Sequence, residues 1–301
     1  MSGTPVSLAT APQTDGAAFG SPIVRRGYVD GPYGQVHYRT AEALEDKGLP
    51  TLVLLHQNPS SSLEYVNLIA QMGRDRRVIA LDTPGYGMSD RPPAPLGMAG
   101  YAAALATALE GLVDPSHGPV DLYGFHTGTL LSIEFALQYP DRVRRLVLSG
   151  IPMHSAQDRA ARLSDALDMP RTEETGEVSL KLAKALWDYV VGARNPGMTL
   201  EDAAEMWVEK LKPLDKSAWA YVGVWSYVYE ERLPLLAHPV LVLQPDEDIA
   251  QQSLDAAKQI SSATVERMIG IDRDIFHDPE SLATLVAAMR RYLDNPIPAG
   301  V

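Results

Sequence analysis

The stretch VDLYGFHTGTLLSIEFALQYP, residues 120–140, decides the fold of this chain. Its first residues, from Val120 to Tyr123, form a short apolar run of the kind found in buried strands. The sequence Gly-Phe-His-Thr-Gly at 124–128 follows, and an amphipathic helical pattern begins immediately after it. So short a connection predicts a sharp turn, with His126 at its centre and at the N-terminus of the helix.

Apolar runs alternate with helical patterns along most of the chain. After a hairpin around Gly31-Pro32-Tyr33-Gly34, the expected strands are 51–56, 77–82, 119–124, 145–150, 239–244 and 263–270. The expected helices lie near 60–73, 99–113, 127–139, 251–261 and 279–293. This alternation predicts an α/β fold with a mostly parallel, doubly wound sheet.

One segment, residues 152–236, interrupts the alternation, because it has helical patterns and no convincing strand. It also contains all four tryptophans of the chain. A segment of this length is too long for a loop, so we expect an inserted helical cap. The core would then comprise residues 26–151 and 237–301, preceded by a flexible tail at 1–25.

Composition excludes several classes of partner and site. The net charge of −12 disfavours nucleic acid and anionic lipid, which require clustered cations. The chain has no cysteine, which excludes disulfides, thiolate catalysis and cysteine-ligated metals. No histidine and carboxylate spacing indicates a metal site. We therefore expect no metal and no cofactor, and a small-molecule substrate as the partner.

Localisation and assembly can also be predicted from the sequence. The first 25 residues lack the basic and apolar regions of a secretory signal. No apolar run reaches the roughly 20 residues that a membrane span needs. We expect a cytoplasmic protein without membrane contact, and exposed apolar cap surface would allow a homodimer.

Six segments together resemble the α/β-hydrolase superfamily, in particular its capped members of the epoxide hydrolase and haloalkane dehalogenase kind. In chain order they are GPYGQVHYR, LLHQNPSSS, ALDTPGYGMSD, GFHTG, VLVLQPDEDIA and HDPESLATLVAAMRRYLD. The resemblance covers about residues 26–293 and implies an α/β-hydrolase fold with an inserted helical cap. It also places His126 at the nucleophile elbow, where the family motif G-x-S-x-G has serine.

The resemblance implies an oxyanion hole made by the backbone N–H groups of Thr127 and Asn58. His56 keeps the histidine of the family's HGxP loop, whereas Gln57 replaces its glycine. A side chain at that position either narrows the hole or adds an amide donor.

The catalytic acid and base are less clearly marked. The family pattern places the acid at Asp248, with Asp246 and Glu247 as close alternatives. The family's histidine after the last strand corresponds by count to Asp272, and the only histidine nearby is His277. Either His277 enters the site through a rearranged loop, or the histidine function has moved to the elbow.

We favour the second interpretation, in which His126 pairs with Asp248 or Asp272, because His277 adjoins a helix start and should lie near the surface. The positive end of the helix dipole disfavours a protonated His126. A neutral imidazole can act as a base or a nucleophile.

The function expected is an enzyme, a hydrolase of a small, partly apolar ester, lactone, epoxide or ketone, with an atypical elbow histidine. Two alternatives stay open. One is a cofactor-free lyase or isomerase on the same scaffold, and the other is a non-catalytic pseudoenzyme that binds a small molecule.

Overall fold

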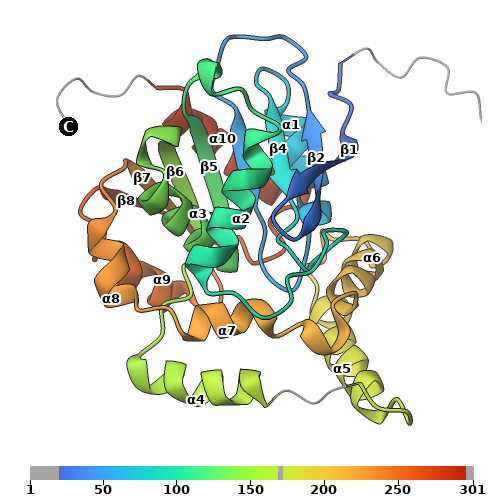
Figure 1. Ribbon diagram of the computed structural model, residues 1–301. Helices are drawn as coiled ribbons and strands as arrows, with labels where there is room; N and C mark the ends of the chain where they lie inside the picture. Colours follow the sequence, from blue (N-terminus) through green and yellow to red (C-terminus); the bar gives the residue numbers. More distant parts are fainter. Residues whose placement is uncertain (1–19, 169–171, 296–301) are drawn as a thin grey trace, which may run out of the picture.

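Within the described residues, 20–168 and 172–295, the computed structural model contains one eight-stranded sheet (Figure 1). Its strands are β1 (Arg25–Gly31), β2 (Gly34–Ala41), β3 (Leu52–Leu55), β4 (Val78–Leu81), β5 (Val120–Phe125), β6 (Val143–Ser149), β7 (Val240–Pro245) and β8 (Ala263–Met268). The helices are α1 (Val66–Met72), α2 (Met98–Glu110), α3 (Thr127–Gln138), α4 (Ala156–Leu167), α5 (Glu177–Trp187), α6 (Leu200–Leu211), α7 (Trp219–Trp225), α8 (Tyr229–Arg232), α9 (Ala250–Ala257) and α10 (Pro279–Leu293).

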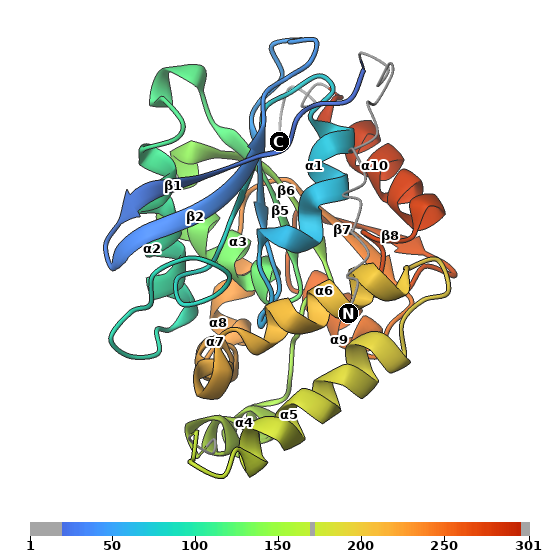
Figure 2. The ribbon, with the colours of Figure 1, turned by 90° about the vertical axis from the view of Figure 1, so that its right-hand side faces the viewer.

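The sheet is parallel except at one edge. Its strand order is β1-β2-β4-β3-β5-β6-β7-β8, and only β2 pairs antiparallel, with β1 and with β4. Helices α2 and α3 cover one face, and α1 and α10 cover the other (Figure 2). Because both faces are covered, β3 and β5 are buried at every residue. The predicted doubly wound, mostly parallel sheet is confirmed.

The segment between β6 and β7, residues 150–239, is termed here the helical insertion. It contains α4 to α8 and no strand among its described residues. Helices α4 to α7 lie across one end of the sheet (Figures 1 and 2). Trp187 and Trp207 meet edge to face inside the insertion, with ring centroids 5.1 Å apart. Tyr221 and Trp225 of α7 pack instead against the core. The cap boundaries at 152 and 236 stay a prediction.

The N-terminal tail that was expected at 1–25 falls mostly on residues 1–19, outside the described part of the chain. Arg25, the last residue of the expected tail, is instead the first residue of β1. Among the helices of the described residues, none combines the length and the apolar character that crossing a bilayer demands.

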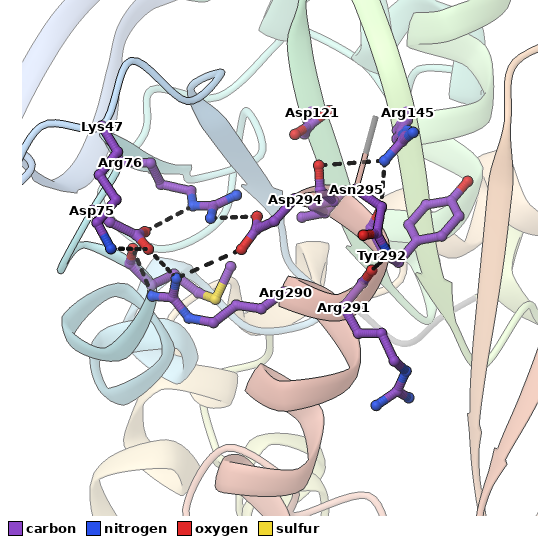
Figure 3. Close-up of polar contacts among 12 residues, drawn as sticks. Lys47, Asp75, Arg76, Asp121, Arg145, Arg290, Arg291, Tyr292, Asp294 and Asn295 are labelled. Atoms are coloured by element: carbon purple, nitrogen blue, oxygen red, sulfur yellow. Dashed lines mark hydrogen bonds and ion pairs between the residues drawn. The ribbon is translucent and has the colours of Figure 1, made fainter. Parts of the chain in front are cut away.

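A cluster of charged residues fastens α10 to the loop before β4 (Figure 3). Asp75 accepts hydrogen bonds from Arg290 and from Arg76, whose Nε lies 3.2 Å from Asp75 Oδ1. Arg76 is fully buried and also donates to Asp294 at 2.6 Å. Burial by itself raises the pKa of the Asp75 carboxyl, but the hydrogen bonds and charges of Arg290 and Arg76 outweigh it, so the net pKa is lowered.

Asp75→Asn should therefore lower the free energy of unfolding at pH 7 by about 2 kcal/mol, since Arg76 and Arg290 each lose one of their two carboxylate partners and keep only Asp294. Because the folded pKa is depressed, this stability is complete above the ordinary value of 3.8 and is lost as the pH falls through the folded pKa. Urea unfolding should give the same difference at pH 7 and pH 5, and a smaller one below about pH 4. The exposed Asp141→Asn serves as the control. A pH-independent difference would contradict this account.

Candidate active site

A pocket of about 910 Å³ lies where the parallel strands end and the helical insertion crosses the sheet. The core contributes residues 57–59 after β3, residues 126–127 after β5, residues 246–249 after β7, and residues 272–273 after β8. Side chains from α4 to α7 complete its lining. The carboxyl ends of parallel strands are the usual position of a site in this architecture.

His126 occupies a strained turn between β5 and α3. Its backbone has φ 48° and ψ −115°, a conformation that non-glycine residues rarely adopt. The turn is possible because Gly128 lets α3 approach β3: a Cβ at that position would overlap the Leu55 carbonyl. The predicted elbow geometry is confirmed. It directs the His126 side chain into the pocket.

His126 pairs with Glu247 across the end of the sheet. The Nε2 of His126 lies 2.6 Å from Glu247 Oε2, and the Glu247 side chain is only 6% exposed. Gln244, fully buried at the end of β7, donates from its amide to the other Glu247 oxygen at 3.2 Å. A carboxylate only accepts, so Nε2 of His126 carries a proton, and in the neutral form of the ring the lone pair lies on Nδ1.

The neighbours of this pair leave it little freedom. The ring of His126 stacks on Phe125 with 4.1 Å between centroids. A Cβ at Gly150, which has φ 70°, would overlap both the imidazole of His126 and the carboxylate of Glu247. The ring is therefore held between Phe125 and the glycine, with Nδ1 free of any partner among the described residues.

The three consecutive acids after β7 serve different purposes. Asp246 Oδ2 accepts the N–H of Gly270 at 2.7 Å, which fastens the turn to the loop after β8. Asp248, the acid that the family pattern indicates, lines the pocket but is exposed and makes no hydrogen bond or ion pair among the described residues. Glu247, between them, is the residue that reaches His126.

The loop after β3 supplies the other polar groups. Thr127 is the first residue of α3, so its N–H has no acceptor within the helix. Asn58 is 3% exposed and lines the pocket, yet neither its amide oxygen nor its amide nitrogen has a partner. A buried amide without partners is costly, which makes this group a candidate ligand contact.

Gln57 and His56 brace this loop. The backbone N–H and the side-chain amide of Gln57 both donate to Glu64, each at 3.1 Å, so Glu64 holds the Gln57 side chain in place. His56 is fully buried, accepts the Thr83 N–H at 2.8 Å, and donates to the Gln57 carbonyl at 2.6 Å. Both ring nitrogens are thus occupied within the protein, and His56 is not among the residues that line the pocket.

Asp272 and His277 lie apart from the His126–Glu247 pair. Asp272 lines the pocket, but one carboxylate oxygen accepts from Asn195 of the insertion at 2.8 Å and the other from the Asp274 N–H at 2.9 Å. His277 is partly buried beneath α6, not at the surface as expected, and lines a separate cavity of about 40 Å³. Burial lowers its pKa, against the opposing influence of Glu64.

Sequence reasoning missed two contributors and favoured a different acid. It placed Asp248 or Asp272 beside His126, whereas the structure places Glu247 there. Gln244 and Lys210 had no recognisable signal, because one lies near the end of an apolar strand and the other belongs to a helix of undistinguished composition. Among the described residues, no group of three histidines or carboxylates has the arrangement of a metal site.

Comparisons with known proteins identify the fold family of the chain. A family model described as alpha/beta hydrolase fold matches residues 50–248. The 2-hydroxy-6-oxo-2,4-heptadienoate hydrolase of Pseudomonas putida is 36% identical over 121 residues, 39% of this chain and 41% of that protein. The haloalkane dehalogenase of Mycolicibacterium paratuberculosis is 26% identical over 212 residues, 63% of this chain and 69% of that protein.

Solved structures resemble the chain over nearly its whole length. The enol-lactonase from Burkholderia xenovorans LB400 has a TM-score of 0.71 at 17% identity, covering 89% of this chain and 100% of that one. At so low an identity, the likeness concerns the fold alone.

Proposed function

Since the chain belongs to the α/β-hydrolase fold family, we propose that it is a hydrolase of small, partly apolar esters or lactones, with His126 as its general base. The observation that carries the proposal is the 2.6 Å contact between His126 Nε2 and Glu247 on a strained elbow. A strained residue with an oriented base and an open pocket is typical of a catalytic centre. The activities of two relatives, a 2-hydroxy-6-oxo-2,4-heptadienoate hydrolase and a haloalkane dehalogenase, support a hydrolytic reaction.

The reaction would proceed in two steps. Nδ1 of His126 removes a proton from water while the water oxygen attacks the carbonyl carbon, and Glu247 stabilises the imidazolium that forms. The backbone N–H groups of Thr127 and Asn58 donate to the resulting oxyanion. When the carbonyl reforms, the bond to the leaving oxygen breaks and the imidazolium returns its proton to that oxygen.

Glu247→Gln should lower kcat by about 10²-fold or more, because a neutral amide neither fixes the ring tautomer nor stabilises imidazolium. Asp248→Asn should lower kcat far less, since Asp248 is exposed and does not contact His126. The measurement is turnover of a panel of activated esters, lactones, enol lactones and epoxides by the wild type and both variants.

The panel also separates the competing functions. Turnover that depends on Glu247 and not on Asp248 supports the proposal. A wild type inactive on every member would contradict it and favour proton transfer without hydrolysis, or ligand binding. Loss of activity in Asp248→Asn alone would show that the pair with His126 is not the catalytic one.

A further inference from the structure

A buried lysine of the helical insertion reaches the pocket beside the β3 loop. Lys210, on α6, is 8% exposed and lines both the main pocket and the smaller cavity behind it. Its Nζ donates to the Pro59 carbonyl at 3.0 Å. An ammonium has three N–H donors, so this single contact leaves two of them without an acceptor among the described residues.

The protein does not supply the anion that such a cation needs. No carboxylate oxygen of the described residues lies within 4.0 Å of Lys210 Nζ. Glu64 is the carboxylate that raises the pKa of Lys210 most, but its oxygens already accept from Gln57 and Ser60. Burial lowers the pKa of Lys210 and Glu64 only partly offsets this, so an additional anion would stabilise the charged form.

Other cations of the pocket are differently placed. Arg273 donates to the carbonyls of Tyr189 and Ala193, and its guanidinium lies 3.7 Å over the Tyr189 ring. Arg162 is exposed and lies over Trp225 at 5.2 Å. Of these three cations, Lys210 is the one that is both buried and short of acceptors. Pro59, whose carbonyl accepts from Lys210, directly follows Asn58, whose side-chain amide has no partner among the described residues.

We propose that Lys210, with the Asn58 amide of the same pocket, binds a carboxylate of the substrate, so that the pocket selects small carboxylic acids bearing the hydrolysable group. This inference rests on the proposed function and names its substrate class. The ammonium and the amide donate to the carboxylate, which supplies the acceptors that the described residues do not give to the ammonium. Lys210 acts here in specificity, whereas His126 performs the proton transfer.

The test compares two unreactive probes of equal shape, 4-phenylbutyrate and its neutral amide, by titration calorimetry. The wild type should bind the acid at least about tenfold more tightly than the amide, the effect of charge-assisted hydrogen bonds. Lys210→Met should abolish the preference, and Lys210→Arg should keep part of it. Lys212→Met, which removes an exposed charge two residues away, should keep all of it.

The outcomes separate this inference from the proposed function. His126→Ala should lose turnover yet keep the preference for the acid; loss of the preference there would place the carboxylate at His126 and overturn the inference. The inference is also overturned if the wild type binds both probes equally or binds neither. It is overturned as well if the preference for the acid survives Lys210→Met and disappears in Arg162→Met. If Lys210→Met has a lower Tm than the wild type, the test uses Lys210→Gln instead, provided that its Tm matches that of the wild type.

Discussion

His126→Ala is expected to lower kcat by about 10²- to 10⁴-fold, the usual contribution of a positioned general base. The substitution removes Nδ1, the unpartnered nitrogen in the pocket, and leaves Glu247 with nothing to orient. The backbone turn and the donors of the β3 loop stay in place, so binding should be affected less than turnover. Steady-state kinetics on the best substrate of the panel, with circular dichroism to verify folding, is the measurement.

The matched control for this variant is His154→Gln. His154 is a second histidine of the same pocket, packed edge-on against Trp225 at 4.9 Å, and burial lowers its pKa. It has no carboxylate partner among the described residues, so its replacement should change kcat less than tenfold. A larger loss of kcat for His154→Gln than for His126→Ala would show that His126 is the wrong histidine for the general base.

His126→Ser extends the same argument. It restores the family's elbow hydroxyl, but the family's histidine position is Asp272, whose oxygens are held by Asn195 and Asp274. A serine without a base is a weak nucleophile, so we expect no recovered esterase activity. A burst of product followed by an acyl-serine adduct in mass spectrometry would mean that another residue serves as base.

Gly128→Ala should cost about 3 kcal/mol of unfolding free energy or more, the largest stability effect expected here. Its Cβ would overlap the carbonyl of Leu55, and a backbone carbonyl in a central strand cannot rotate away. Helix α3 would have to shift away from β3, which also displaces the elbow. Urea unfolding gives the loss directly, and kcat reports the displacement.

Gly97→Ala is the control for the loss of glycine itself. Gly97 precedes α2 with φ −71°, and a Cβ there meets no atom within 4 Å. Its cost should stay under about 1 kcal/mol. Equal stability of Gly128→Ala and the wild type would refute the close approach of α3 to β3.

The order and type of the elements followed from local patterns in the sequence. The parallel sheet was predicted from apolar runs of strand length with helical periodicity between them. Such runs indicate parallel strands because a strand that is buried on both faces has no alternation of apolar and polar residues. The start of α10 was also readable, because Asp278 caps the helix and Pro279 occupies its first turn.

The contents of the site were only partly readable. The family resemblance assigned His126, Thr127 and Asn58 to the site, and all three line the pocket. His126 directly follows β5, Thr127 begins α3, and Asn58 lies in the loop after β3. The orientation of a side chain inside an irregular turn depends on remote contacts. Asp246 is drawn to Gly270, and that contact leaves Glu247 rather than Asp248 facing His126.

The sequence by itself determined the α/β fold, the strained elbow with histidine at its centre, and the insertion between β6 and β7, because these depend on residues close together in the chain. Only the tertiary structure decided that Glu247 is the partner of His126, that α6 covers His277, and that Lys210 meets Pro59. Those contacts join residues that are far apart in the sequence, and their geometry comes from how the insertion packs over the sheet.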